Sequence, residues 1–211
     1  MLKRFAAALA ILTLHVAASA DIIIGQTTGI TGPSAEVVRE ITAGATMYFD
    51  AVNDKGGLHG QRVRLVSIND KQVPAASATN ARKLVLEDQA VALFLVRGTS
   101  NSLAIMKDLD SLRVPLVAPS TGAEALHKPV HRWVFNVRSA YQAEAQALVR
   151  LLSTMGYSRI GVALRDDSYG EDAISGLKAG FEDAKTSAVF VVRIDPKQPK
   201  FEELAKKVAE T

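Results

Sequence analysis

The sequence contains no cysteine, a single tryptophan and no cluster of basic residues. Because there is no thiol, the sequence excludes thiol catalysis, thiolate metal ligation and stabilisation by disulfide bonds. The 25 basic and 22 acidic residues nearly balance, and the sequence has no basic stripe with interleaved aromatics, which argues against a nucleic-acid partner. The hydrophobic fraction of 48% is nevertheless sufficient for a substantial core in one or two domains.

Long apolar runs are also scarce, and the one that stands out lies in residues 1–20. Lys3 and Arg4 precede a short apolar stretch, and Ala18-Ser19-Ala20 follows it. This order is typical of a secretory signal peptide cleaved before Asp21. The alternative, an N-terminal membrane anchor, is disfavoured because the stretch is short for a bilayer. We therefore expect an exported chain without stable membrane insertion once residues 1–20 are removed.

Short strands alternate with longer amphipathic helices over residues 21–118. The pattern predicts strands at residues 21–25, 62–69, 91–96 and 114–118, and helices at residues 35–54, 74–87 and 100–112. Gly56-Gly57 is expected to end the first of these helices. Such an alternation favours the α/β class, with a parallel sheet that carries helices on both faces.

A second series of elements follows a loop at residues 120–132. The pattern predicts strands at residues 133–137, 158–164 and 188–194, and helices at residues 139–155, from Ser168, and at residues 200–210. Ser139 with Gln142, and Ser168 with Glu171, have the form of capping boxes. Because the chain stops inside a predicted helix, we expect it to be a fragment whose second series is incomplete.

The glycine-rich turn "IIIGQTTGITGPSAE", residues 22–36, does not match a nucleotide-binding loop. Counted from Gly25, Ile30 stands where a Walker loop needs its second glycine, and no Lys-Ser/Thr pair follows. Gly29 and Gly32 are three residues apart, which is not the dinucleotide fingerprint. What remains is a strand-to-helix turn at the carboxyl edge of the sheet, where ligands bind in open α/β folds.

Neither a metal centre nor a catalytic constellation is visible in the sequence. Pro129 separates His127 from His131, so these two histidines do not share a helix face. No serine lies in a nucleophile-elbow context. We therefore expect a protein without metal or cofactor that is not an enzyme.

Three strand ends are rich in hydroxyl groups: "RGTSNS" at residues 97–102, "APSTGAEAL" at residues 118–126 and "RDDSYG" at residues 165–170. At the first, a helix begins with free backbone N–H groups that can hold a carboxylate. Ordinary N-capping by Thr99 or Ser100 is the alternative there. Because carboxyl ends of parallel strands meet at one edge, the three stretches predict one shared cleft.

Five stretches occur in the order typical of a known family: "IGQTTGITGP", "AVNDKGGLHGQRVRLVSIND", "VPLVAPSTGAEAL", "VFNVRSAYQAE" and "RDDSYGEDAISGLKAGFE". On these residues the chain resembles the type I periplasmic solute-binding proteins of ABC transporters, the leucine/isoleucine/valine-binding protein family. The resemblance implies two α/β lobes that enclose a ligand between them. After the signal peptide of residues 1–20, we therefore expect the first lobe at residues 21–120, a crossover or hinge region at 121–138 and an incomplete second lobe at 139–211.

The resemblance also implies a set of ligand-binding residues. It places the ligand carboxylate at Gly98, Thr99 and Ser100, and the ligand's amino end at Tyr169. The loop after the next strand adds Ser120, Thr121 and Gly122 to the set. Arg138 either lines the cleft, where it could bind a second acidic group, or braces the hinge. Val37 replaces an aromatic residue and Arg97-Gly98-Thr99 replaces a serine-richer loop of the branched-chain group, so leucine itself is not implied.

The expected function is that of a periplasmic receptor. It would capture a small carboxylate-bearing solute, an amino acid or a related organic acid or amide, and deliver it to ABC permease subunits in the inner membrane. An exported sensory domain could use the same cleft for signalling. An α/β enzyme acting on nucleotides or acyl groups is the other alternative, although neither a nucleotide fingerprint nor a triad is visible.

Overall fold

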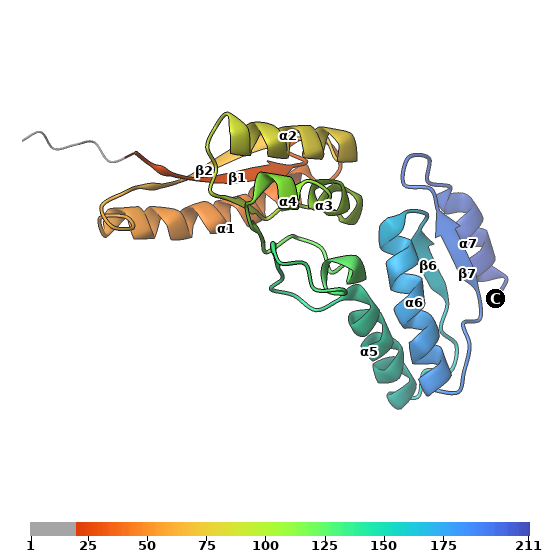
Figure 1. Cartoon of the computed structure of the whole chain (residues 1–211). Coiled ribbons are helices and arrows are strands. Elements are labelled where there is room, and N and C mark those ends of the chain that lie inside the picture. The colour runs from red at the N-terminus through yellow and green to blue at the C-terminus, as the bar shows by residue number, and fades with distance from the viewer. Residues whose placement is uncertain (1–19) are drawn as a thin grey trace, which may run out of the picture.

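The computed structural model describes residues 20–211, in which two parallel sheets form two α/β lobes (Figure 1). The predicted signal peptide lies outside the described residues, except for Ala20. The predicted α/β class is confirmed, since short strands alternate with helices through the described chain. Within residues 20–211, no helix is both long enough and apolar enough to cross a membrane.

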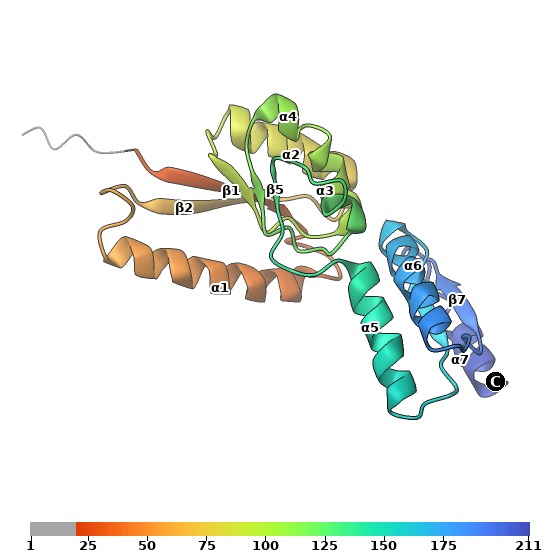
Figure 2. The same cartoon turned by 60° about the horizontal axis from the view of Figure 1, so that its bottom comes forward.

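The first lobe is built on a parallel sheet with strand order β2-β1-β3-β4-β5. Its strands are β1 (Ile22–Thr28), β2 (Val63–Asn69), β3 (Ala92–Phe94), β4 (Leu116–Val117) and β5 (Val134–Phe135). Its helices are α1 (Ala35–Asp54), α2 (Pro74–Leu86), α3 (Thr99–Met106), α4 (Leu109–Leu112) and the 3-10 helix η1 (Glu124–Leu126). Helix α1 lies on one face of the sheet, and α2, α3 and α4 lie on the other (Figure 2).

The core of the first lobe lies between the sheet and α2, α3 and α4. Leu84 of α2, Leu93 of β3 and Ile105 of α3 are each 0% exposed. The parallel register pairs Leu93 with Leu116, so the apolar strand residues pack beneath the helices and bury the area that stabilises the lobe.

The second lobe contains the parallel pair β6 (Val162–Arg165) and β7 (Val191–Ile194). Its helices are α5 (Tyr141–Thr154), α6 (Ser168–Asp183) and α7 (Phe201–Ala209). Val149, Leu164 and Phe181 belong to its core cluster. Helices α5 and α6 pack closely because α6 presents glycine to α5: a Cβ at Gly176 would lie 2.1 Å from the Gln142 carbonyl oxygen.

Several predicted boundaries are wrong in informative ways. The helix predicted over residues 100–112 is two helices, α3 and α4. The strand predicted at residues 133–137 as the start of the second series is β5, which pairs with β4 in the first sheet. Trp133 and Val134 pack against the core of the first lobe, and an apolar strand pattern does not specify which sheet the strand joins.

Neither predicted capping box forms. Helix α5 begins after Ala140 without a side-chain cap. Helix α6 is capped by Asp167, whose carboxylate accepts hydrogen bonds from the backbone N–H groups of Tyr169 and Gly170 at 3.0 and 3.2 Å. Asp is as strong an N-cap as Ser, and the helix starts at the earlier residue. The predicted end of α1 is confirmed, because Gly56 and Gly57 follow it with φ values of 95° and 72°.

Candidate functional site

A cavity of about 630 Å³ lies between the two lobes. Each of the seven strands described in residues 20–211 contributes a lining residue after its carboxyl end: Gly29 after β1, Gln72 after β2, Arg97 after β3, Ser120 after β4, Arg138 after β5, Tyr169 after β6 and Lys197 after β7. Parallel strands direct the following loops and helix N-termini to one edge. The two lobes therefore place their loop-rich edges toward a common space, whose size is typical of small-molecule sites.

The six predicted residues that line this cavity are Gly98, Thr99, Ser100, Ser120, Arg138 and Tyr169. Thr121 and Gly122 do not line it. Thr121 is 0% exposed, and its hydroxyl is paired with that of Thr99 at 2.8 Å. The carbonyl oxygen of Gly122 accepts from the Tyr141 backbone N–H at 2.6 Å, which ties the loop after β4 to the start of α5.

The start of α3 has no side-chain cap. Its N-cap is Gly98, with φ 102°, and Thr99 and Ser100 lie in the first turn. The alternative of ordinary capping by Thr99 or Ser100 is therefore wrong. The N–H groups of this turn have no capping side chain, so the helix presents donors and the positive end of its dipole to the cavity.

A buried carboxylate that the sequence patterns did not reveal positions α3. Asp70 follows β2, is 1% exposed, and accepts hydrogen bonds from Asn101 Nδ2 at 3.1 Å and Ser77 Oγ at 2.7 Å. The Gln72 backbone N–H and Thr27 Oγ1 donate to the same carboxylate. This network joins the ends of β1 and β2 to α2 and to the first turn of α3. A single aspartate after a strand is too common a pattern to predict this hydrogen-bond network.

On the side of the second lobe, two tyrosine rings and an ion pair form the wall. The rings of Tyr141 and Tyr169 meet edge to face with centroids 4.8 Å apart. Arg138 lies over the Tyr141 ring at 4.8 Å and its Nη2 is 2.6 Å from Glu144 Oε2. Hydrogen bonding to Glu144 raises the pKa of the Arg138 guanidinium. Arg138 therefore lines the cavity and is also paired with Glu144 of α5; whether it binds a ligand or braces a hinge stays a prediction.

The lobes touch at the rim of the cavity. Ser100 in α3 and Ser168 in α6 share a hydrogen bond of 2.7 Å between their hydroxyls. Asp172 of α6 accepts from the Glu124 backbone N–H at 2.9 Å and from Gln142 Nε2 at 3.0 Å. The N-terminal turns of α3 and α6 thus meet across the gap (Figure 2).

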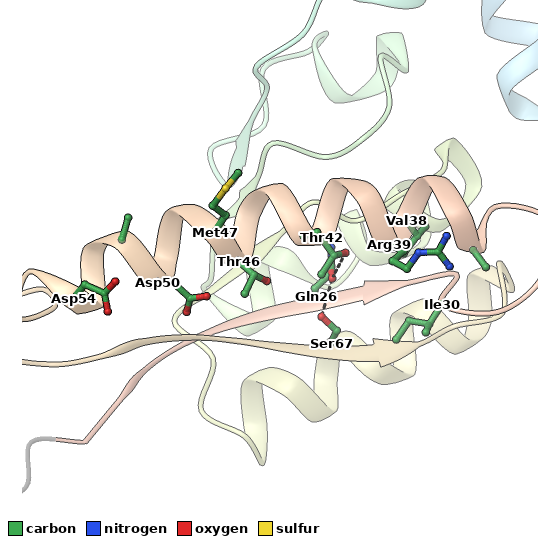
Figure 3. A pocket seen from close by; sticks show the side chains of 13 residues that line it. Gln26, Ile30, Val38, Arg39, Thr42, Thr46, Met47, Asp50, Asp54 and Ser67 are labelled. Atoms are coloured by element: carbon green, nitrogen blue, oxygen red, sulfur yellow. Dashed lines mark hydrogen bonds between the residues drawn. The ribbon is translucent and has the colours of Figure 1, made fainter.

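A second, larger groove of about 860 Å³ lies on the first lobe alone, between α1 and the strands β1 and β2 (Figure 3). Within it, Gln26 Oε1 accepts hydrogen bonds from Thr42 Oγ1 at 3.3 Å and Ser67 Oγ at 2.7 Å. The second lobe contributes no residue to it. Among residues 20–211 there is also no group of three His, Asp or Glu side chains suited to a metal ion.

Two parallel α/β lobes with a cavity between their strand ends define the class of two-lobed solute-binding proteins. Residues 21–211 match the family model described as periplasmic binding protein. The chain belongs to this family, and the predicted resemblance is confirmed. A curated relative from Brucella melitensis, 26% identical over 91% of this chain, is named Leu/Ile/Val-binding protein homolog 3.

Individual relatives agree with this assignment. A substrate-binding periplasmic protein from Ralstonia solanacearum has 32% identity and a TM-score of 0.83, over 89% of this chain and 53% of that one. The Leu/Ile/Val-binding protein BraC3 of Rhizobium johnstonii is 29% identical over 90% of this chain and 52% of its own length. A solute-binding protein of an ABC transporter from R. palustris, in complex with benzoate, has a TM-score of 0.83 at 20% identity, over 90% of this chain and 52% of that one. This last likeness shows the fold alone.

The chain spans about half the length of the curated relatives it matches, from 46% to 52%.

Proposed function

We propose that the complete protein is a periplasmic receptor that captures a small carboxylate-bearing solute in the cavity between its lobes and delivers it to an ABC permease. The observation that carries the proposal is the convergence of all seven strand ends on one cavity of about 630 Å³. Family membership supports it, because relatives are named for binding Leu/Ile/Val or were solved with benzoate. Both kinds of compound carry a carboxylate.

In the proposed mechanism, the first lobe binds the carboxylate and the second lobe covers it. The uncapped N–H groups of α3 and the hydroxyls of Ser100 and Ser120 are the donors. The buried hydrogen bond between the hydroxyls of Thr99 and Thr121 holds the Thr99 hydroxyl beside them. Tyr169, which is 40% exposed, then covers the apolar part of the ligand when the lobes close. No bond is made or broken.

The test is ligand binding by the complete protein. Amino acids, aromatic acids, dicarboxylates and amides are first screened by thermal shift, because a ligand selective for the native state raises its melting temperature. The double change Thr99→Ala with Ser100→Ala is then expected to weaken binding of the selected ligand by about 1 to 3 kcal/mol. Titration calorimetry measures the difference.

The matched control is Thr79→Ala with Ser111→Ala. Both hydroxyls are exposed and bond only to backbone carbonyls, of Ala75 and Asp108, so this variant should bind like the wild type. Equal affinity of the two double variants would argue against the site at α3. Uptake of the labelled ligand by cells with and without the gene tests delivery to the permease.

A further inference from the structure

Gln72 lies in the loop between β2 and α2 and lines the interlobe cavity on the side of the first lobe. Gly29, in the loop after β1, lines the same cavity. The two loops follow the carboxyl ends of paired parallel strands, so they lie side by side at the edge where open α/β folds bind ligands. The set of binding residues predicted from the sequence includes neither residue.

The backbone of Gln72 is held in one conformation. Lys71 and Gln72 have φ values of 51° and 60°, in the left-handed region that most residues avoid. The Asp70 carboxylate accepts a hydrogen bond from the Gln72 backbone N–H at 2.8 Å, and Asn69 Oδ1 accepts one from the Lys71 N–H at 3.0 Å. Asn69 Oδ1 also accepts from the Ile30 N–H at 3.0 Å, which joins the two loops. The direction in which the Gln72 side chain leaves the backbone is therefore set by its neighbours.

The Gln72 side chain packs over Gly29. A Cβ at Gly29 would lie 2.8 Å from Gln72 Cγ and 3.3 Å from Gln72 Nε2. Carbon atoms that are not bonded to each other pack at about 3.5 to 4.0 Å, so a side chain at position 29 would displace Gln72. Glycine at this position thus provides the space that the Gln72 side chain occupies at the wall of the cavity.

The loop that carries Gln72 is also joined to the start of α3. Asn101, in the first turn of α3, donates to Asp70 at 3.1 Å, and Gln72 is two residues further along the chain. A small ligand held at α3 therefore extends within reach of the Gln72 side chain. The amide of that side chain is uncharged and offers two N–H donors and one acceptor oxygen.

From this arrangement we infer that Gln72 is a specificity-determining residue, whose amide hydrogen-bonds a hydroxyl or carboxamide group of the ligand. The inference rests on the proposed function and narrows its ligand class. A site that hydrogen-bonds such a group discriminates against an analogue of the same shape without it, because the polar atoms of the site are then left unpaired. A charged group at this place would lose more hydration than a neutral amide returns.

The experiment compares compounds of similar shape that differ in one polar group. The pairs are leucine with asparagine, valine with threonine, and 4-methylpentanoate with succinamate, each titrated into the complete protein by calorimetry. Compounds from the wider screen that carry a hydroxyl or carboxamide are titrated in the same way. Gln72→Met keeps an unbranched side chain of similar length but has no amide. It should weaken binding of the polar compound by about 3- to 10-fold and change binding of its apolar partner by less than about 2-fold.

Gly29→Ala tests the packing of Gln72 independently. In the wild-type background it should weaken binding of the polar compound about as much as Gln72→Met does, because the new methyl group displaces the amide. In the Gln72→Ala background it should have little further effect, because the Cγ that the methyl would meet is gone. Equal losses in both backgrounds would contradict the role given to Gly29 in positioning Gln72.

Two variants serve as matched controls. Gln89 also has a left-handed φ, of 57°, but it is exposed and does not line the cavity, so Gln89→Met should bind like the wild type. Gly44→Ala should do the same, because a Cβ at Gly44 would meet no atom of residues 20–211 within 4 Å. Unliganded melting temperatures of all variants show whether the fold is kept.

The outcomes separate this inference from the proposed function. If only compounds without a hydroxyl or carboxamide bind, or if Gln72→Met leaves binding of the polar compounds unchanged, the inference is wrong and the proposed function stands. If none of the six probes and no compound of the wider screen binds, both are contradicted.

Discussion

At the scale of the residue, Asp70 is the side chain on which the geometry of the candidate site depends most. Its carboxylate is 1% exposed and accepts from four donors. Asp70→Ala removes the acceptor and leaves Ser77, Asn101 and the Gln72 N–H without it, so we expect the free energy of unfolding to fall by about 2 to 3 kcal/mol. Urea denaturation of the complete protein measures this.

The exposed Asp110, with 70% of its side chain accessible, supplies the control for that experiment. Asp110→Ala should change the free energy of unfolding by less than about 0.5 kcal/mol. If Asp70→Ala also lowered the free energy of unfolding by less than about 0.5 kcal/mol, the buried network would not be what positions α3. The hydrogen bond from Asn101 to Asp70 would then contribute little to the site.

Residue by residue, the sequence predicted which strand ends bear the site better than it predicted which side chains face the cavity. The hydroxyl-rich stretches after β3 and β6 include Thr99, Ser100 and Tyr169, which line the cavity. The same signal led to Thr121, which points inward and is fully buried against Thr99. Composition gives the chemistry of a loop, but the direction of each side chain depends on backbone angles that no local pattern fixes. Whether these residues contact a ligand stays a prediction.

At the scale of the element, the helix starts differ from their sequence signatures, and this difference can be measured. Asp167 caps α6 through two backbone N–H groups, so Asp167→Ala should destabilise the protein by about 1 kcal/mol. Ser139, which had the form of an N-cap, is exposed and caps nothing, so Ser139→Ala should be nearly neutral. Thermal unfolding of the two variants compares their losses of stability. A larger loss for Ser139→Ala than for Asp167→Ala would mean that the predicted cap at Ser139 forms after all.

The alternation of strands and helices was predictable because it depends on apolar periodicity, which burial imposes on each element separately. Helix α1 was predicted with its observed bounds, 35–54, since twenty residues carry a clear period. The assignment of β5 to the first sheet was not predictable, because a two-residue strand gives no period and its pairing with β4 depends on contacts made elsewhere in the chain. The sequence therefore predicts a long helix well, but it does not predict which strand a very short strand pairs with.

At the scale of the whole molecule, the proposed mechanism requires the lobes to separate before a ligand can enter, and the contact of Ser100 with Ser168 allows this to be tested. Their hydroxyl oxygens are 2.7 Å apart across the two lobes, and the chain has no cysteine. In the double variant Ser100→Cys with Ser168→Cys, we expect oxidation to form a disulfide between the lobes that holds them together. Ligand association should then slow by at least about 10-fold, and reduction should restore it.

The reduced form of that double variant is its own control, because it carries the same two substitutions without the covalent link. Association is followed by stopped-flow tyrosine and tryptophan fluorescence, and a non-reducing gel shows the fraction that is cross-linked. Equal association rates in the oxidised and reduced forms, with the disulfide demonstrably formed, would mean that ligands reach the cavity without lobe opening. The hinge between the lobes would then play no part in capture, because access to the candidate site would already exist in the closed arrangement.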